Sequence, residues 1–175
     1  MCLIIEVIYG FNGDVLRGIL ELEKRVFPSD WQFEDAENYF KEKLENPRNV
    51  NIVMKDECGG IVGYAMSVPY SDALIEIAED DPEMLAIEDC YYIEAFELDP
   101  ENQKFKTFSP LLEKLIDESI KRGAKKLSMH ARVSVGASSI IRKRFKGKIV
   151  IARRIDNWVN YAGKEPTDYI VVDCF

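Results

Sequence analysis

The stretch that decides the fold is Tyr91-Tyr92-Ile93-Glu94-Ala95-Phe96-Glu97-Leu98-Asp99-Pro100. Its aromatic and branched residues favour a strand, and Asp99-Pro100 ends the pattern. A polar, basic turn at Glu101–Thr107 follows, and then an amphipathic pattern that predicts a helix over Pro110–Arg122. Ser109 is the expected cap, because it precedes a proline at the first helical position. A strand, a basic turn and a helix N-terminus in this order are typical of a site for a phosphorylated ligand.

Upstream of this stretch, the chain predicts a strand, two helices and a hairpin. The strand is Leu3–Tyr9, and the first helix is expected to be capped by Asn12 or Asp14. Ser29 and Gln32 have the spacing of a capping box for the second helix. The remaining features are the hairpin of Asn49–Lys55 with Ile61–Val68, small residues at Gly63 and Ala65 that permit close approach, and an acidic, partly helical insertion over residues 70–89.

Downstream, the chain predicts two more strands and a helix before a final strand. Lys126–Ala131 alternates as a strand, a helix follows over Gly136–Phe145, and Ile149–Ile155 and Tyr169–Phe175 end the chain. Residues 162–166 are expected to form a turn between the last two strands. The element order predicts an α/β (α+β mixed) fold with a mixed, mostly antiparallel sheet, flanked by helices on both faces. We expect residues 1–175 to form a single domain.

Composition indicates a globular protein. Of the 175 residues, 47% are hydrophobic and 31% are charged, which is typical of a folded chain rather than a disordered one. No apolar run approaches the length of a membrane span, and the start of the sequence lacks the pattern of a signal peptide, so we expect a cytoplasmic location. Four separate cysteines and one histidine, His130, give no zinc-binding pattern, and reduced structural thiols are expected.

The net charge of −8 is unevenly distributed along the chain. Residues 1–90 contain 7 basic and 20 acidic residues, whereas residues 91–175 contain 16 basic and 11 acidic residues. An acidic first half suits a cationic partner and a basic second half suits an anionic one. Two solvated faces with no specific partner would give the same distribution.

The element order and three stretches resemble the GNAT acetyltransferase superfamily, whose members transfer an acyl group from coenzyme A to an amine. The first stretch is Tyr92–Glu101, which looks like the central strand of that family. The second comprises Leu111–Ile120 and Lys126–Met129, which look like the helix and strand that follow. The third, Asn160-Tyr161 with Asp168–Val172, looks like the closing hairpin.

This resemblance implies acetyl-coenzyme A as co-substrate and a set of residues that contact it. In the family, backbone groups of the central strand contact the pantetheine, and a loop of pattern R/Q-x-x-G-x-G/A holds the pyrophosphate. Gln103 matches the first position of that loop, whereas Lys106 and Phe108 stand where glycines are expected, and lysine side chains could replace backbone dipoles with direct charge. The implied contact residues are Phe96, Glu97, Leu98, Gln103, Lys104, Phe105, Lys106, Thr107, Phe108, Ser109 and Ser138.

Amine acetylation requires a base for the amine and an acid for the departing thiolate. Strand alternation predicts that Tyr92, Glu94, Phe96 and Leu98 share one face, on which the carboxylate of Glu94 is the outlier. Glu94 is therefore the candidate general base, with a pKa raised by burial; a structural carboxylate paired with Arg or Lys is the alternative. Tyr161 is the candidate acid or a core tyrosine.

The sequence departs from the family pattern at two positions, and two further polar residues each have two possible roles. Val135 and Arg142 stand at the positions of an asparagine and a thiolate-protonating tyrosine, so neither role transfers. Ser138 is a pantetheine contact or a helix-capping serine, and the capping role is favoured. His130 is a proton relay or a satisfied polar residue, and the second role is favoured.

The charge pattern favours a cationic acceptor, either a small molecule or a protein amine, on the side of the acidic insertion. The basic run Arg142–Lys148 is expected to contact the 3′-phosphate of the cofactor or to be a solvated helix end. It lacks the aromatic interleaving of a nucleic-acid site, so nucleic acid is disfavoured as a partner. No membrane partner is expected, and the chain is a monomer or a homodimer. The alternative function is a GNAT-fold binding or regulatory module that binds coenzyme A or a protein without turnover.

Overall fold

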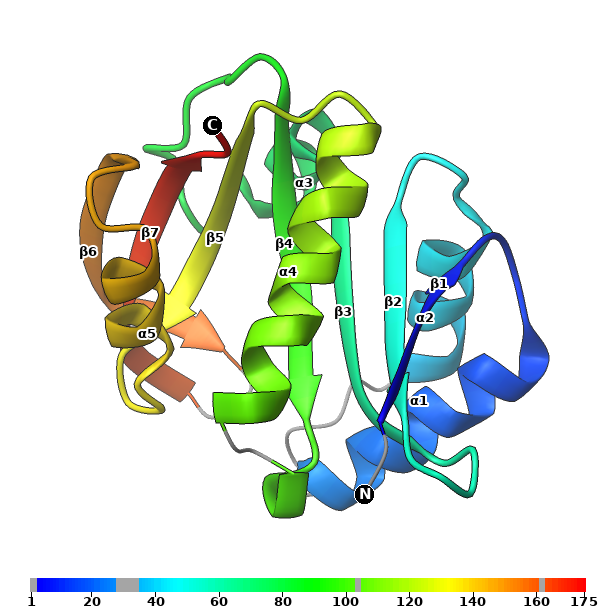
Figure 1. The fold of residues 1–175 in the computed structure, drawn as a ribbon. Coiled ribbons are helices and arrows are strands. Elements are labelled where there is room, and N and C mark those ends of the chain that lie inside the picture. Colours follow the sequence, from blue (N-terminus) through cyan, green and yellow to red (C-terminus); the bar gives the residue numbers. More distant parts are fainter. Residues whose placement is uncertain (1–2, 28–34, 103–104, 161–162) are drawn as a thin grey trace. The chain divides into compact units, whose positions relative to one another are not determined.

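The computed structural model describes residues 3–27, 35–102, 105–160 and 163–175, and its elements follow the predicted order (Figure 1). The first half contains β1 (Ile4–Ile8), α1 (Gly13–Val26), α2 (Ala36–Glu45), β2 (Val50–Lys55), β3 (Ile61–Pro69) and α3 (Tyr70–Ile77). The second half contains β4 (Cys90–Leu98), a 3₁₀ turn (Pro100–Asn102), α4 (Phe105–Lys121), β5 (Lys126–Arg132), α5 (Ala137–Arg144), β6 (Ile149–Asn160) and β7 (Gly163–Asp173).

The strands form one mixed sheet in the order β1-β2-β3-β4-β5-β7-β6. The pairs β1–β2, β2–β3, β5–β7 and β6–β7 are antiparallel, and β4–β5 is parallel. The parallel register runs from Cys90 opposite Lys126 to Tyr92 opposite Ser128. The mostly antiparallel mixed sheet predicted from the sequence is therefore confirmed.

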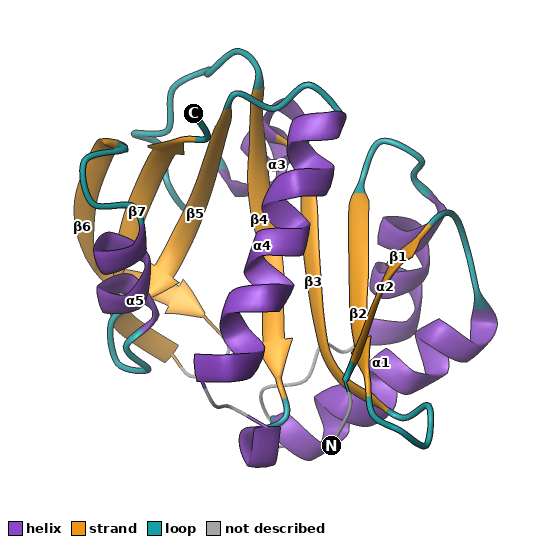
Figure 2. Cartoon of the chain, in the orientation of Figure 1, coloured by secondary structure: helices purple, strands orange, loops and turns teal. Residues whose placement is uncertain are grey.

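The chain folds into two compact units, each built from two segments. Unit 1 contains residues 1–67 and 94–119, and unit 2 contains residues 68–93 and 120–175. The expectation of a single domain over residues 1–175 stays a prediction. In Figure 2 the helices and strands of each unit can be followed by colour.

Unit 1 carries helices on both faces of its strands, and β3 shows why. Tyr64 and Met66 pack into a core cluster with residues of α1 and α2. On the opposite face, a Cβ at Gly63 would lie 3.6 Å from Leu111 of α4, and Ser67 hydrogen-bonds Ser119 of α4 over 2.9 Å. Alternation along β3 thus sends large side chains to one pair of helices and small ones to α4. The predicted close approach at Gly63 is confirmed.

The helix α1 begins as the sequence predicts. Asn12 is its N-cap, and its side-chain oxygen accepts hydrogen bonds from the backbone N–H groups of Asp14 and Val15. Val15, Ile19 and Leu22 are buried on one face. The capping box predicted at Ser29 and Gln32 lies outside the described residues, and α2 is described from Ala36.

Unit 2 repeats the two-faced arrangement on β7. Tyr169 and Val171 pack into a cluster with Tyr70 and Ala73 of α3. Asp168, one residue earlier, receives a hydrogen bond from Ser138 of α5 on the opposite face. The predicted insertion between the strands therefore consists of α3 and the loop that follows it. This loop, residues 78–89, is called the acidic segment.

Two predicted boundaries are wrong. The helix α4 begins at Phe105, so Ser109 and Pro110 lie inside it rather than at its start. A proline is tolerated this close to a helix N-terminus, because only one backbone hydrogen bond is lost and the buried stripe of α4 outweighs it. The last hairpin is also longer than predicted, since β7 begins at Gly163 and includes Pro166, whose carbonyl accepts a hydrogen bond from Val133.

Within the ranges that the structure describes, no helix combines the length and the apolar composition that a membrane crossing requires.

Candidate functional site

Glu94 and Phe96 lie on different faces of β4, although strand alternation predicts that they share one. Glu94 contacts α2, and its neighbour Ala95 packs against the cluster that α1 and α2 form. Phe96 instead lies on the face of α4, where its ring centroid is 4.7 Å from that of Phe108. The prediction that Glu94 and Phe96 share a face is therefore wrong. Two consecutive side chains on one side are what a β-bulge produces, and bulges re-aim side chains.

Glu94 is held by two side chains from one helix. The hydroxyl of Tyr39 donates to Oε1 over 2.8 Å, and Nζ of Lys43 lies 3.2 Å from the same oxygen. The side chains of Glu94 and Lys43 are only 10% and 11% exposed. The other oxygen, Oε2, is buried and has no hydrogen-bond partner among the described residues. A buried carboxylate oxygen without a partner is costly, which is typical of a site that a ligand completes.

The pair of Tyr39 and Lys43 was not among the residues singled out from the sequence. In the sequence, Phe33, Ala36, Phe40 and Leu44 recur at helical spacing as an apolar stripe, and Tyr39 and Lys43 each precede a residue of this stripe. Their spacing of four residues places them on one helix face. A tyrosine and a lysine at this spacing beside an apolar stripe is the signal that could have pointed to them.

A second buried acid of unit 1 lies nearby in α1. Glu23 accepts a hydrogen bond from the hydroxyl of Tyr64 over 2.6 Å. Burial raises the pKa of Glu23 above its usual range, although the hydrogen bond from Tyr64 opposes this. The pKa of Tyr64 is raised as well, by burial first and then by the charge of Glu23. Glu23 and Tyr64 are hydrogen-bonded to each other, whereas Oε2 of Glu94 has no hydrogen-bond partner among the described residues.

The expected cofactor contacts on β4 and α4 lie close together in unit 1. Leu98 is buried, and a Cβ at Gly63 would lie 2.5 Å from its Cδ2. Glu97 accepts a hydrogen bond from the N–H of Leu98 through its own Oε1. Thr107 is buried in the first turn of α4, where Phe108 and Ser109 are partly exposed. The backbone N–H groups of that first turn have no acceptor inside the helix, which suits an anion.

The missing glycines of the loop cause no backbone strain. Lys106 and Phe108 are α-helical, and Asp89 is the only non-glycine residue with positive φ in the described part of the chain. The conformational freedom of glycine is therefore not needed at either position. Of the other expected contacts, Gln103 and Lys104 lie outside the described residues, as does Tyr161, and Phe105 is described here by its backbone alone.

Ser138 lies in unit 2 and is already engaged. Its hydroxyl donates to Asp168, which also accepts from Arg142 over 3.1 Å and from Arg154 over 2.5 Å. Hydrogen bonds from Arg154, Ser138 and Arg142 lower the pKa of Asp168 below its usual range, although burial itself raises it. The helix-capping role favoured for Ser138 is wrong. The N-cap residue of α5 is Gly136, and no side chain forms a capping hydrogen bond there.

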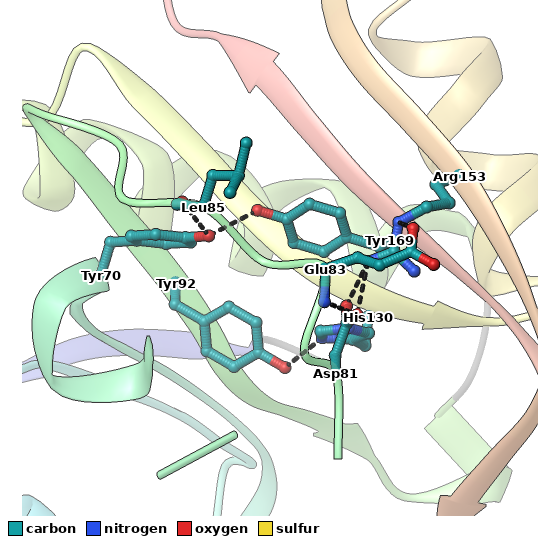
Figure 3. A network of polar contacts seen from close by, with 8 residues as sticks. All are labelled: Tyr70, Asp81, Glu83, Leu85, Tyr92, His130, Arg153 and Tyr169. Carbon is teal, nitrogen blue, oxygen red and sulfur yellow. Dashed lines mark hydrogen bonds and ion pairs between the residues drawn. The ribbon is translucent and has the colours of Figure 1, made fainter. Parts of the chain in front are cut away.

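His130 belongs to a buried polar network in unit 2 (Figure 3). Its Nε2 lies 3.1 Å from Oδ2 of Asp81, and its Nδ1 lies 2.9 Å from the hydroxyl of Tyr92. Since a carboxylate only accepts, neutral His130 donates through Nε2 and accepts from Tyr92 through Nδ1. The ring also stacks on Trp158 at 4.1 Å. Both ring nitrogens are engaged, which matches the satisfied polar residue expected from the sequence.

The same network fixes the acidic segment. Asp81 is paired with Arg153 at 2.6 Å, and its side chain is 2% exposed. Burial raises the pKa of Asp81, but hydrogen bonds from Arg153 and His130 outweigh it and lower the pKa. Burial lowers the pKa of His130, against the opposing effect of Asp81. Tyr70 and Tyr169 add a hydroxyl–hydroxyl contact of 2.8 Å (Figure 3).

Three acids of the segment are thus committed to pairs, namely Asp81, Glu83 with Arg153, and Asp89 with Lys125. Glu79, Asp80 and Glu88 are exposed. The acidic charge available to a cationic ligand is therefore smaller than the sequence indicates.

Comparison with known proteins gives one matching family and many solved structures of similar fold. A sequence model of the Acetyltransferase (GNAT) family matches residues 16–140. Comparison with curated proteins gives no match. Among solved structures, the chain is similar to the ribosomal-protein-S18-alanine N-acetyltransferase from Escherichia coli, at 20% identity and a TM-score of 0.69, over 99% of this chain and 94% of that one.

Two further solved structures show the same fold. One is an aminoglycoside 6′-N-acetyltransferase complexed with coenzyme A, at 11% identity and a TM-score of 0.71, over 98% of this chain and 97% of that one. The other is NAA60 from Arabidopsis thaliana in complex with a bisubstrate analogue, at 12% identity and a TM-score of 0.69, over 98% and 99% of the two chains.

Proposed function

Because the chain belongs to the Acetyltransferase (GNAT) family, we propose that it transfers an acetyl group from acetyl-coenzyme A to a primary amine, with Glu94 as general base. The acceptor is a small molecule or a protein amine. The similar structures include an enzyme named for aminoglycosides and one named for a ribosomal protein, so both acceptor kinds occur on this fold.

The observation that carries the proposal is the state of the Glu94 carboxylate. Oε1 is held by Tyr39 and Lys43, whereas Oε2 is buried without a partner among the described residues. An acceptor amine that donates to Oε2 would complete the hydrogen bonding of this group. A carboxylate that is fixed at one oxygen and has no described partner at the other is suited to take a proton.

The residues around β4 and α4 fit a coenzyme A thioester. The N-terminus of α4 carries the positive end of the helix dipole, which favours phosphate, and the Phe96–Phe108 contact offers apolar surface in the same unit. The thioester supplies an activated acetyl group. Backbone groups of Phe96, Glu97 and Leu98 would hold it, and Ser109 lies in the same turn of α4.

The role of Glu94 is to take one proton from the acceptor ammonium at Oε2, which leaves a neutral amine with a free electron pair. That pair forms the new C–N bond as the C–S bond breaks. The nitrogen then loses its second proton to give the neutral amide, and this loss balances the proton that the departing thiolate gains. Tyr161 is proposed as the donor to that thiolate. Ser138 of unit 2 stays a predicted cofactor contact, and its hydroxyl proton is already directed to Asp168.

The test measures thiol release from acetyl-coenzyme A with a panel of amines. The panel contains a monoamine without other charged groups, polyamines and lysine peptides. Wild-type protein is expected to release thiol in an amine-dependent manner. Glu94→Gln is expected to lower kcat by about 10²–10⁴-fold, which is the usual contribution of a general base. Glu42→Gln, an exposed acid on α2, is the matched control and should retain wild-type rates.

A thermal-shift titration separates this function from the alternative module. Acetyl-coenzyme A should raise the melting temperature, since a ligand that binds only the native state stabilises it. A shift without thiol release for any amine would favour the binding module. Absence of both would reject acetyl-coenzyme A as a ligand.

A further inference from the structure

The geometry around Glu94 assigns a role to Lys43: it holds the carboxylate at Oε1 and matches its charge, so that the acceptor amine is not trapped there as an unreactive ammonium. This inference rests on the proposed function, because it concerns the same carboxylate. Lys43 is a positioning residue rather than a catalytic one, since it contacts Glu94 and not the reacting atoms.

Lys43 is itself fixed at its backbone. Its carbonyl accepts hydrogen bonds from the side-chain amides of Asn49 and Asn51, over 3.0 and 3.1 Å, and both asparagines are buried. Asn51 lies in β2, so the C-terminal part of α2 is tied to the sheet of unit 1. The side chain itself is only 11% exposed, so packing restricts its rotamers, and restricted rotamers on a fixed backbone support a preorganised group.

Tyr39 and Lys43 hold one carboxylate oxygen of Glu94, and the other oxygen is left for the acceptor. Both contact Oε1, and Nζ of Lys43 also lies 5.3 Å from the centroid of the Tyr39 ring. A carboxylate offers about four acceptor positions, so Oε2 remains able to accept from an amine. The two side chains thus orient the carboxylate and leave one oxygen for the acceptor.

The charge of Lys43 decides in which form the acceptor binds. An isolated buried carboxylate is costly, and Lys43 is the cation that pairs with Glu94 among the described residues, so without Lys43 the acceptor ammonium would take its place. Such a pair would bind strongly in the ground state and hold the amine in its protonated form. With Lys43 in place the charge of the carboxylate is already balanced. The acceptor ammonium therefore gains less binding free energy in the ground state. Lys43 therefore favours turnover over affinity.

The experiment compares steady-state kinetics of Lys43→Met with those of Lys41→Met. Lys41 lies on the same helix, is 47% exposed and pairs only loosely with Glu45 at 3.9 Å, so its removal should change neither parameter. Lys43→Met should lower kcat by about 10- to 100-fold, as expected for a misplaced catalytic group, and should lower KM for the amine as well. A loss of folded protein alone would not lower KM.

Three further variants keep the test decisive. Lys43→Arg should recover kcat to within about threefold, because it restores the cation, and Lys43→Gln should behave like Lys43→Met if the latter folds poorly. In a Glu94→Gln background, Lys43→Met should have little further effect, because the two residues act as one unit.

The outcomes separate this inference from the proposed function. If the wild-type protein shows no turnover with any amine, the proposed function fails. If the wild type and Glu94→Gln behave as expected but Lys43→Met leaves kcat unchanged or raises KM, the role of Lys43 is wrong and the base assignment stands.

Discussion

At the scale of single residues, Gly63 shows how little space separates β3 from β4 in unit 1. A Cβ at this position would lie 2.5 Å from Cδ2 of Leu98 and 3.1 Å from the carbonyl oxygen of Glu97. The carbonyl belongs to a backbone that cannot move without disturbing the strand. We predict that Gly63→Ala lowers the free energy of unfolding by about 1–3 kcal/mol, as overpacking does, measured by urea denaturation.

Gly13→Ala is the matched control for this substitution. Gly13 is the first residue of α1, and an added Cβ there would meet no atom within 4 Å. Alanine favours a helix over glycine by up to about 1 kcal/mol, so the urea midpoint should stay the same or rise. Equal losses for both variants would show that the close approach at Gly63 does not limit stability.

At the scale of elements, the acidic segment 78–89 is held to the strands of unit 2 by Asp81. Removal of one partner from a buried ion pair leaves an uncompensated charge, which costs about 3–5 kcal/mol. We predict that Asp81→Asn destabilises the protein by an amount of this order and exposes the segment to limited proteolysis. Both urea denaturation and the rate of cleavage within residues 78–89 measure this.

Glu83 provides the comparison for Asp81. It pairs with the same Arg153 at 3.4 Å, but its side chain is 72% exposed. Exposed ion pairs contribute about 0–1 kcal/mol, so Glu83→Gln should leave both the stability and the cleavage rate close to wild type. Faster cleavage of the segment in Glu83→Gln than in Asp81→Asn would contradict the assignment of Asp81 as its anchor.

At the scale of the whole molecule, the buried His130 makes stability depend on pH. Burial lowers the pKa of His130 in the folded state, whereas the unfolded chain has a histidine pKa of about 6.5. Between these values the unfolded state binds more protons, so stability is fully present above pH of about 6.5 and decreases as the pH falls toward the folded pKa. We predict that the melting temperature falls between pH 7.5 and 5.5, measured by calorimetry.

His130→Gln isolates this contribution, because glutamine does not titrate. The variant is expected to lose stability at pH 7.5 but to show a smaller further decrease on acidification. The raised pKa of Glu23 has the opposite sign, since its folded form retains a proton that the unfolded chain has released, and it is unchanged in the variant. Equal slopes in both proteins would mean that His130 does not titrate as described.

The sequence predicts the element order correctly because this order depends on local patterns. The strand over Tyr91–Leu98 is visible in its branched and aromatic residues, and the cap at Asn12 follows from neighbouring residues. The start of α4 at Phe105 was missed, since a basic turn and a first helical turn have the same composition. The turned face of Phe96 was missed, because one added residue reverses a period of two without any mark in the sequence.

The partners of the candidate site lie beyond what local patterns can reach. Tyr39 and Glu94 are 55 residues apart, and Asp81 and Arg153 are 72 residues apart. Their contacts depend on how the strands are ordered, which a single sequence does not specify. The burial of Asp81 and His130 could not be predicted for the same reason, since Asp81 occurs in an acidic stretch and His130 on the polar face of its strand.

The interleaving of the two units has a consequence for the order in which the chain can fold during synthesis. Unit 1 lacks its second segment until residue 119 has left the ribosome, and in unit 2 one hydrogen-bond partner of Tyr70 is Tyr169, which lies 99 residues later in the chain. Tyr70 therefore lacks its contact with Tyr169, and Asp81 of the acidic segment lacks Arg153, until these later residues have been made. Loop closure over 99 residues is slow compared with local helix formation, so this half of the molecule is the one in which chaperones have time to act.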